Sequence, residues 1–175
     1  MRRILFALIA VSVACGSDSK SGSTTGPSPN IPSVAGIWRG NARATSITGG
    51  DCLSVGLQSQ IGVVAPVSLT ITQSGTAITA TLVSLNDGVT SEFTGTASNN
   101  AITLNGTFSS AAVVNGITCT NGLRRDMRIQ TAAITGSVSG NTLTGDYVEN
   151  WNVSSSATGA ALGVLIYRAT ATVTR

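Results

Sequence analysis

The sequence contains no histidine, and its one lysine is Lys20, close to the amino terminus. Without histidine, Ser-His-Asp and Cys-His catalysis and histidine-based metal sites are excluded. No Gly-x-Gly-x-x-Gly or phosphate-loop pattern occurs. The sequence therefore predicts a protein that is not an enzyme and that holds neither a metal ion nor a cofactor.

Charge and aromatic side chains are also scarce, at 10% and 4% of the residues. From residue 33 onward, seven arginines face six acidic residues, so the chain has no basic field of the kind that nucleic acids require. Serine, threonine, asparagine and glycine are abundant instead, a balance typical of exported β proteins. About 140 residues beyond the amino-terminal segments suffice for one domain.

The amino terminus has the three parts of an export signal. Arg2 and Arg3 precede an apolar run over residues 4–10, and small residues follow up to Ala14. The apolar run is too short to span a bilayer. We therefore predict a signal peptide over residues 1–14.

The stretch Ser12-Val13-Ala14-Cys15 resembles the lipobox of bacterial lipoproteins, although Ser12 stands where that family usually has an aliphatic residue. The resemblance implies acylation of Cys15 and a lipid anchor in the cell envelope, and Gly16, in a host with two membranes, implies the outer membrane. The alternative is an ordinary signal peptide cut near Ala14. Residues 15–32, rich in Ser, Gly, Thr and Pro, are predicted to form a flexible tether.

Residues 33–175 alternate between apolar and polar side chains and are interrupted by turn residues, which predicts consecutive antiparallel strands. Three turns, at residues 74–76, 98–100 and 139–141, share one pattern of small polar residues, and Asp87-Gly88 marks another turn. We predict an all-β domain, an eight-stranded antiparallel up-and-down β-barrel, which leaves no exposed edge. The strands are expected at residues 34–45, 66–73, 77–85, 90–97, 101–109, 127–138, 142–152 and 162–174.

Successive connections in such a barrel alternate between its two ends. The three matching turns fall at one end, and the long connections, residues 46–65, 110–126 and 153–161, fall at the other, the mouth. The first long loop is expected to contain a short amphipathic helix, because apolar residues recur there at three- and four-residue spacing: Leu53, Leu57, Ile61 and Val64. Cys52 and Cys119 lie in two of these long loops, and in an oxidising compartment they are expected to form a disulfide; two free thiols are the alternative.

Gly36-Ile37-Trp38, at the start of the first strand, resembles the Gly-x-Trp motif of lipocalins and the wider calycin group of eight-stranded barrels. The resemblance implies that Trp38 packs at the closed end of the barrel, beneath an arginine from the last strand. Arg175 is the counterpart by position, and Arg168 is the alternative. It also implies a barrel that binds a small hydrophobic ligand.

Candidate ligand contacts come from one face of a predicted strand and from one charge cluster. Tyr147, Glu149 and Trp151 alternate, so they share the inward face. Glu149 is then either a polar anchor for a ligand or a carboxylate near the mouth that is solvated or paired with an arginine. Arg124 and Arg125, at the mouth, allow anion recognition or else a solvated loop paired with Asp126. Two functions remain open: a lipid-anchored barrel that binds a small hydrophobic ligand, or a structural or protein-interaction lipoprotein with a fully packed barrel. The sequence names no protein partner.

Overall fold

A computed structural model describes residues 33–107 and 113–175. The predicted signal peptide, the lipid-anchor residue Cys15 and the tether of residues 15–32 lie outside the described residues. The described strands are β1 (Gly36–Gly49), β2 (Val64–Ser74), β3 (Ala77–Ser84), β4 (Thr90–Ser98), β5 (Ala101–Thr107), β6 (Val113–Thr118), β7 (Arg124–Ser139), β8 (Thr142–Ser155) and β9 (Ala161–Thr174).

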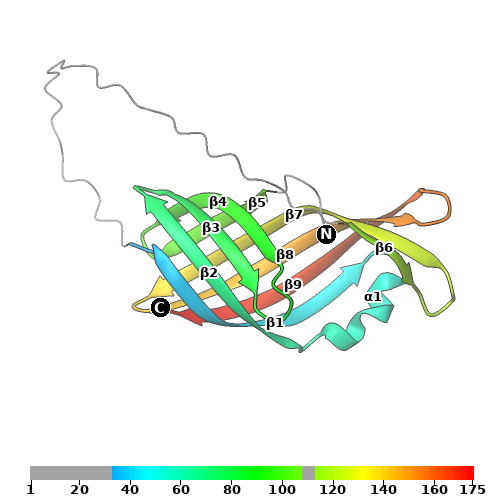
Figure 1. The fold of residues 1–175 in the computed structure, drawn as a ribbon, viewed down its shortest axis with the longest axis horizontal. Coiled ribbons are helices and arrows are strands. Elements are labelled where there is room, and N and C mark those ends of the chain that lie inside the picture. The colour runs from blue at the N-terminus through cyan, green and yellow to red at the C-terminus, as the bar shows by residue number, and fades with distance from the viewer. Residues whose placement is uncertain (1–32, 108–112) are drawn as a thin grey trace, which may run out of the picture. The chain divides into compact units, whose positions relative to one another are not determined.

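Eight of these strands close into an antiparallel barrel (Figure 1). Each strand from β1 to β4 pairs with the next, β7 pairs with β8 and β8 with β9, and β9 returns to β1. The ring is closed by β5 and β7, where Ala101 lies opposite Ser137 and Asn105 opposite Ala133. The predicted eight-stranded barrel is confirmed.

The extra strand β6 and the start of β7 lie within residues 110–126, which were expected to form one long loop. That expectation was wrong for residues 113–118 and 124–126. β6 pairs with the first part of β7, from Arg124 to Arg128, on the same edge that β5 uses farther along. Its register shifts between Val114 and Ile117, around Gly116 at φ +69°. Because Val113 and Val114 are both exposed, the strand is held by the backbone of β7 and lacks the alternating burial that reveals a strand in a sequence.

The strands differ in length, and this difference shapes the mouth. β1, β7, β8 and β9 have 14 to 16 residues, whereas β2 to β5 have 7 to 11. The long strands continue past the short ones at the mouth end, so that the predicted loops shrink to residues 50–63 and 156–160 (Figure 1). Two of the long strands, β1 and β7, contain a β-bulge. The register shifts between Ala44 and Ser46 in β1 and between Ile129 and Thr131 in β7, which interrupts the alternation of inward and outward side chains.

The first long loop contains the predicted short helix, reduced to one turn. α1 spans Leu53–Gly56 and is followed by the 3-10 turn η1, Gln58–Gln60. Leu53 is buried, but Ile61 and Val64, which were expected on the same apolar face, are exposed, and Val64 already belongs to β2. No helix within residues 33–107 and 113–175 has the length and apolar character needed to cross a bilayer.

Two apolar cores hold the domain together. The larger one fills the closed end around Trp38, Phe93 and Leu104. The smaller one lies beneath the first long loop, where Leu53 packs with Cys119 of the β6–β7 connection and with residues of the extended long strands: Ile47, Met127, Val153 and Leu165. The half-buried Trp151 packs against both cores.

Trp38 is fully buried, and its indole Nε1 donates a hydrogen bond to the carbonyl oxygen of Val34, 2.9 Å away. The guanidinium carbon of Arg175 lies 4.7 Å from the centre of the Trp38 ring. The same guanidinium donates to the carbonyl oxygens of Ser33 and Ala35. Of the two candidate arginines, Arg175 is therefore the one over Trp38, and it joins the two ends of the barrel chain; Arg168 is exposed.

Candidate functional site

The barrel contains a cavity of about 300 Å³. Its wall is mostly apolar and comes from seven strands and the β3–β4 connection: Ala42, Ala65, Val67, Leu69, Leu82, Ser84, Asp87, Val89, Ser91, Ile134, Leu143, Gly145, Asp146, Tyr147, Glu149, Tyr167, Ala169, Ala171 and Val173. Asp87 and Val89 are exposed at the mouth end, so the cavity extends from the interior to the mouth.

The cavity exists because one row of facing positions carries almost no side-chain volume. Across neighbouring strands, Ala65 lies opposite Ala42, Ala42 opposite Ala171, and Ala171 opposite Gly145. Gly145 in turn lies opposite Gly136. A barrel of this size is normally filled by large side chains that complement small ones, and here the row from β2 to β7 is small throughout.

The glycines of this row also meet a backbone requirement. A Cβ atom at Gly145 would lie 2.7 Å from the carbonyl oxygen of Thr135, a distance that forces the strands apart. The close approach of the β7 and β8 backbones therefore demands glycine there, and the absence of a side chain is part of what leaves the interior hollow.

A polar cluster forms one part of the cavity wall and its neighbourhood. Glu149 accepts hydrogen bonds at both carboxylate oxygens, at Oε1 from the Tyr147 hydroxyl and at Oε2 from the Trp151 indole Nε1, 2.8 Å away. These three residues alternate along β8, as the sequence indicated, and Tyr167 lies directly across on β9. The structure thus brings together Tyr147, Glu149 and Trp151, and adds Tyr167. Tyr147, Glu149 and Tyr167 line the cavity, whereas Trp151 is outside the lining and is bonded to Glu149.

Both tyrosines of the cluster are held in the neutral form. Burial, together with the nearby Glu149 carboxylate, raises the pKa of Tyr147 far above its ordinary value, and the same causes raise the pKa of Tyr167. The ring of Tyr147 meets Phe93 and Tyr167 edge to face, with centroids 6.4 Å apart in each pair. The cluster is therefore an ordered group of aromatic rings around one carboxylate.

Exposed apolar side chains gather at the mouth. Of the described large hydrophobic residues that are exposed, Ile37 lies near the closed end, and the others lie in or beside the mouth connections: Val55, Ile61, Val63, Val64, Leu85, Val89, Val113, Val114, Leu123 and Val164. Val89 also lines the cavity. The entrance is therefore apolar on its outside as well as its inside.

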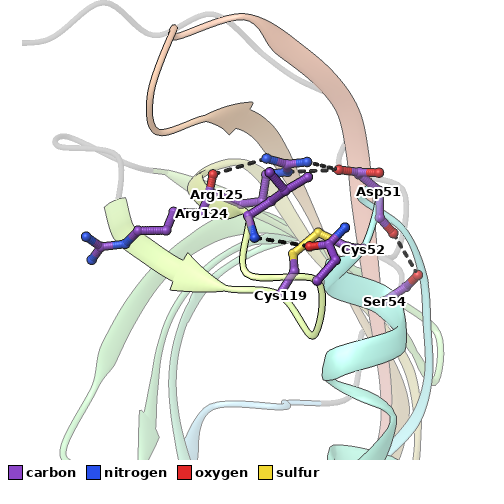
Figure 2. A network of polar contacts seen from close by, with 8 residues as sticks. Asp51, Cys52, Ser54, Cys119, Arg124 and Arg125 are labelled. Carbon is purple, nitrogen blue, oxygen red and sulfur yellow. Dashed lines mark hydrogen bonds and ion pairs between the residues drawn. A yellow bond between two sulfur atoms is a disulfide. The ribbon is translucent and has the colours of Figure 1, made fainter.

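The first long loop is fastened to the β6–β7 region by two cross-links (Figure 2). Cys52 and Cys119 form the predicted disulfide, with Cα atoms 5.8 Å apart. Beside it, Arg125 is 7% exposed and donates from Nε and Nη2 to Asp51 Oδ2, at 2.8 and 2.6 Å. Asp51 has φ +56° and follows two glycines that also have positive φ, a conformation that aspartate tolerates better than most residues.

The two mouth arginines make structural contacts. Arg125 pairs with Asp51, 74 residues away in the sequence, and Arg124 Nε donates to the carbonyl oxygen of Gly116. Neither residue is among those that line the cavity. Asp126, the partner expected from the sequence, accepts from the Ser156 hydroxyl and the Gly116 amide, and these hydrogen bonds, with the nearby charge of Arg124, lower its pKa. The expected local attraction therefore involves Arg124, whereas Arg125 pairs with Asp51.

Comparison with protein-family models, curated proteins and solved structures finds no match to this chain.

The remaining acidic groups form no site of their own. Asp87 Oδ1 accepts from the Val89 amide, which is the role that its turn predicts. Among the residues that the structure describes, no three His, Cys, Asp or Glu side chains come together as a group that could hold a metal ion. A depression of about 470 Å³ on the outer face of β7 to β9 is lined mainly by threonine and glycine and has no converging charged cluster.

The alanine row was missed in the sequence, although its alternating positions were visible. Alanine is compatible with either a filled or a hollow interior, because only the side chains opposite it decide which results. The Asp51–Arg125 pair had an indirect signal: the expected Cys52–Cys119 bridge brings the residues next to Cys52 close to those that follow Cys119.

The Asp51–Arg125 pair gives a prediction about acid stability. The hydrogen bond from Arg125 lowers the pKa of Asp51 below its ordinary value of 3.8. A carboxyl group with a lowered pKa in the folded state stabilises the fold above its unfolded-state pKa, and this contribution disappears as the pH falls through the lower value. We expect Asp51→Asn to lower the free energy of unfolding at pH 7. On acidification below pH 4, this free energy should fall less in the variant than in the parent.

Thermal unfolding between pH 7 and pH 3 measures this difference. Glu92→Gln, on the outer face of β4, is the matched control for loss of a carboxylate. Asp87 and Asp126 also have lowered pKa values, so the Asp51 variant should keep part of the acid sensitivity. Equal acid losses in the parent and in Asp51→Asn would contradict a stabilising role for the pair.

Proposed function

We propose that the barrel binds a small apolar or amphipathic molecule in its interior. The observation that carries this proposal is the cavity of about 300 Å³, with an apolar wall and a small group of converging polar side chains. Small-molecule sites commonly have volumes from about 300 to 1,000 Å³ and this same mixture of lining. The closed eight-stranded barrel is consistent with a calycin-like fold, whose members bind ligands in the same place.

The alternative, a fully packed barrel that acts only through its surface, fits the interior less well. Such a barrel needs large side chains opposite the row of Ala65, Ala42 and Ala171, and a cavity lies there instead. The exposed apolar residues at the mouth suit an entrance for an apolar ligand.

Titration with a neutral hydrophobic dye, N-phenyl-1-naphthylamine, tests the proposed function. The full chain carrying Cys15→Ser is suitable, because no acyl chain can then occupy the cavity. We expect micromolar binding, with a change in Trp151 emission because its indole is bonded to the cavity residue Glu149. Trp151→Ala should weaken binding about tenfold, the loss of roughly 1.4 kcal/mol. A well-folded chain that does not bind the dye would support the packed-barrel alternative.

We propose further that the chain is a lipoprotein of the cell envelope, anchored through Cys15. The support is the apolar run, the lipobox-like Ser12-Val13-Ala14-Cys15 and the tether-like composition that follows. Cys15→Ser should abolish labelling by a fatty acid and release the protein from membranes, whereas Ser17→Ala should do neither. A Cys15→Ser protein that still sediments with membranes would contradict an anchor at this residue.

The placement in the outer membrane depends on Gly16 and on a host with two membranes. Gly16→Asp should then retain the lipoprotein in the inner membrane. Membrane fractionation of the two forms tests this, and an unchanged distribution would contradict sorting by this position.

A further inference from the structure

The charges that border the cavity are all negative. Its described lining includes three acidic residues, Asp87, Asp146 and Glu149, and no arginine. Asp146 lies on the outer face of β8 by strand alternation, and Asp87 lies at the exposed rim. Glu149 is therefore the charged group that the strand presents to the interior.

The Glu149 carboxylate is held in place by two uncharged donors. Both of its hydrogen-bond partners, the Tyr147 hydroxyl and the Trp151 indole, are neutral donors, and each bonds a different oxygen. A carboxylate oxygen has two lone pairs, so each oxygen can accept a further hydrogen bond. Glu149 is half-buried, and no arginine of the described residues forms an ion pair with it, so a cationic ligand would replace interactions that its carboxylate loses with water.

The rings around Glu149 favour the same kind of partner. Tyr147 and Tyr167 line the cavity together with Glu149, and Tyr167 faces it across the β8–β9 pair. The face of an aromatic ring attracts a cation, and ammonium groups are commonly bound by several such rings. A carboxylate in the ligand would instead meet a like charge, which such a site disfavours.

We propose that the ligand is an organic cation, an apolar body that carries a protonated amine; this proposal rests on the interior binding function proposed above. The ammonium group bonds to Glu149 beside Tyr147 and Tyr167. The apolar body occupies the space along Ala42 and Ala171, where the wall has no polar side chain.

Three ligands with the same alkyl chain test this choice: octylamine, 1-octanol and octanoate. Each displaces N-phenyl-1-naphthylamine from the full Cys15→Ser chain at pH 7, at concentrations below micelle formation. We expect octylamine to bind at least tenfold more tightly than octanoate, with 1-octanol between them. Glu149→Gln should weaken octylamine about tenfold and leave 1-octanol nearly unchanged, whereas Glu92→Gln on the outer wall should change neither.

The outcomes separate the two proposals. If the three ligands bind alike, or octanoate binds best, the cation proposal is overturned and the interior binding function stands. If neither the dye nor any of the three ligands binds a folded chain, the interior binding function itself is overturned. Should Glu149→Gln fail to fold, as judged by circular dichroism, the order of the three affinities for the parent chain decides the matter.

Discussion

Trp38→Ala is expected to lower the free energy of unfolding by about 3–5 kcal/mol, the range for truncation of a buried aromatic side chain. Trp38 is fully buried in the larger core, its indole nitrogen bonds to Val34, and Arg175 covers the ring. Truncation leaves a cavity, an unpaired carbonyl oxygen and an arginine without its aromatic partner. Domains of this kind have a total stability of about 5–15 kcal/mol, so the loss is a large part of it.

Urea unfolding of the parent and the variant measures this loss. Trp38→Phe is the informative control, because it keeps most of the apolar volume and removes only the indole hydrogen bond, and it should cost clearly less. Trp151→Ala should also cost less, because Trp151 is only half-buried. A loss below about 1 kcal/mol for Trp38→Ala would show that the closed end does not depend on this residue.

Removal of the Cys52–Cys119 disulfide is expected to cost about 4 kcal/mol on the chain-entropy estimate. The bond joins residues 67 positions apart, so the unfolded chain gains much freedom when it is broken. Cys119 is also buried in the smaller core, and the double variant Cys52→Ala and Cys119→Ala tests the bond with little change of polarity.

The expected signature is a lower midpoint in urea for the double variant and for the parent protein in reductant. Once the bond is absent, reductant should have no further effect, and this is the internal control. Peptide mapping without reductant should recover the two cysteines in one linked fragment. Free thiols at both positions in protein purified without reductant would contradict the bond.

Much of the fold could be predicted because most strands bury the side chains of one face and expose those of the other face to solvent. The tight turns between them contain glycine, asparagine or serine, which also marked their ends. β6 could not be found in this way, since Val113 and Val114 are exposed and the strand depends on the edge of β7. The extended ends of β1 and β8 were missed because long strands that leave the barrel pack against loop residues, and no local pattern in the sequence indicates such packing.

The part of the candidate site whose residues lie on one strand could be predicted from the sequence. The parts that depend on contacts between several segments of the chain could not. Tyr147, Glu149 and Trp151 alternate on β8, so their shared face could be read directly. The role of Arg125 depends on Asp51, which approaches it only in the folded chain. The cavity depends on Ala42, Ala65 and Ala171 together, and each of these alanines is unremarkable by itself.

The effect of filling the interior tests the central claim, that the barrel holds a ligand cavity. Ala42→Leu inserts a larger side chain at the middle of the alanine row, and Asn41→Leu inserts the same side chain on the outer face of β1. For each variant, dye affinity and urea stability are measured on the full Cys15→Ser chain. We predict that Ala42→Leu weakens dye binding at least tenfold without loss of stability, because the side chain enters existing space, and that Asn41→Leu leaves binding unchanged. Undiminished binding in Ala42→Leu, or a destabilisation of about 1–3 kcal/mol as in an overpacked core, would contradict a hollow interior.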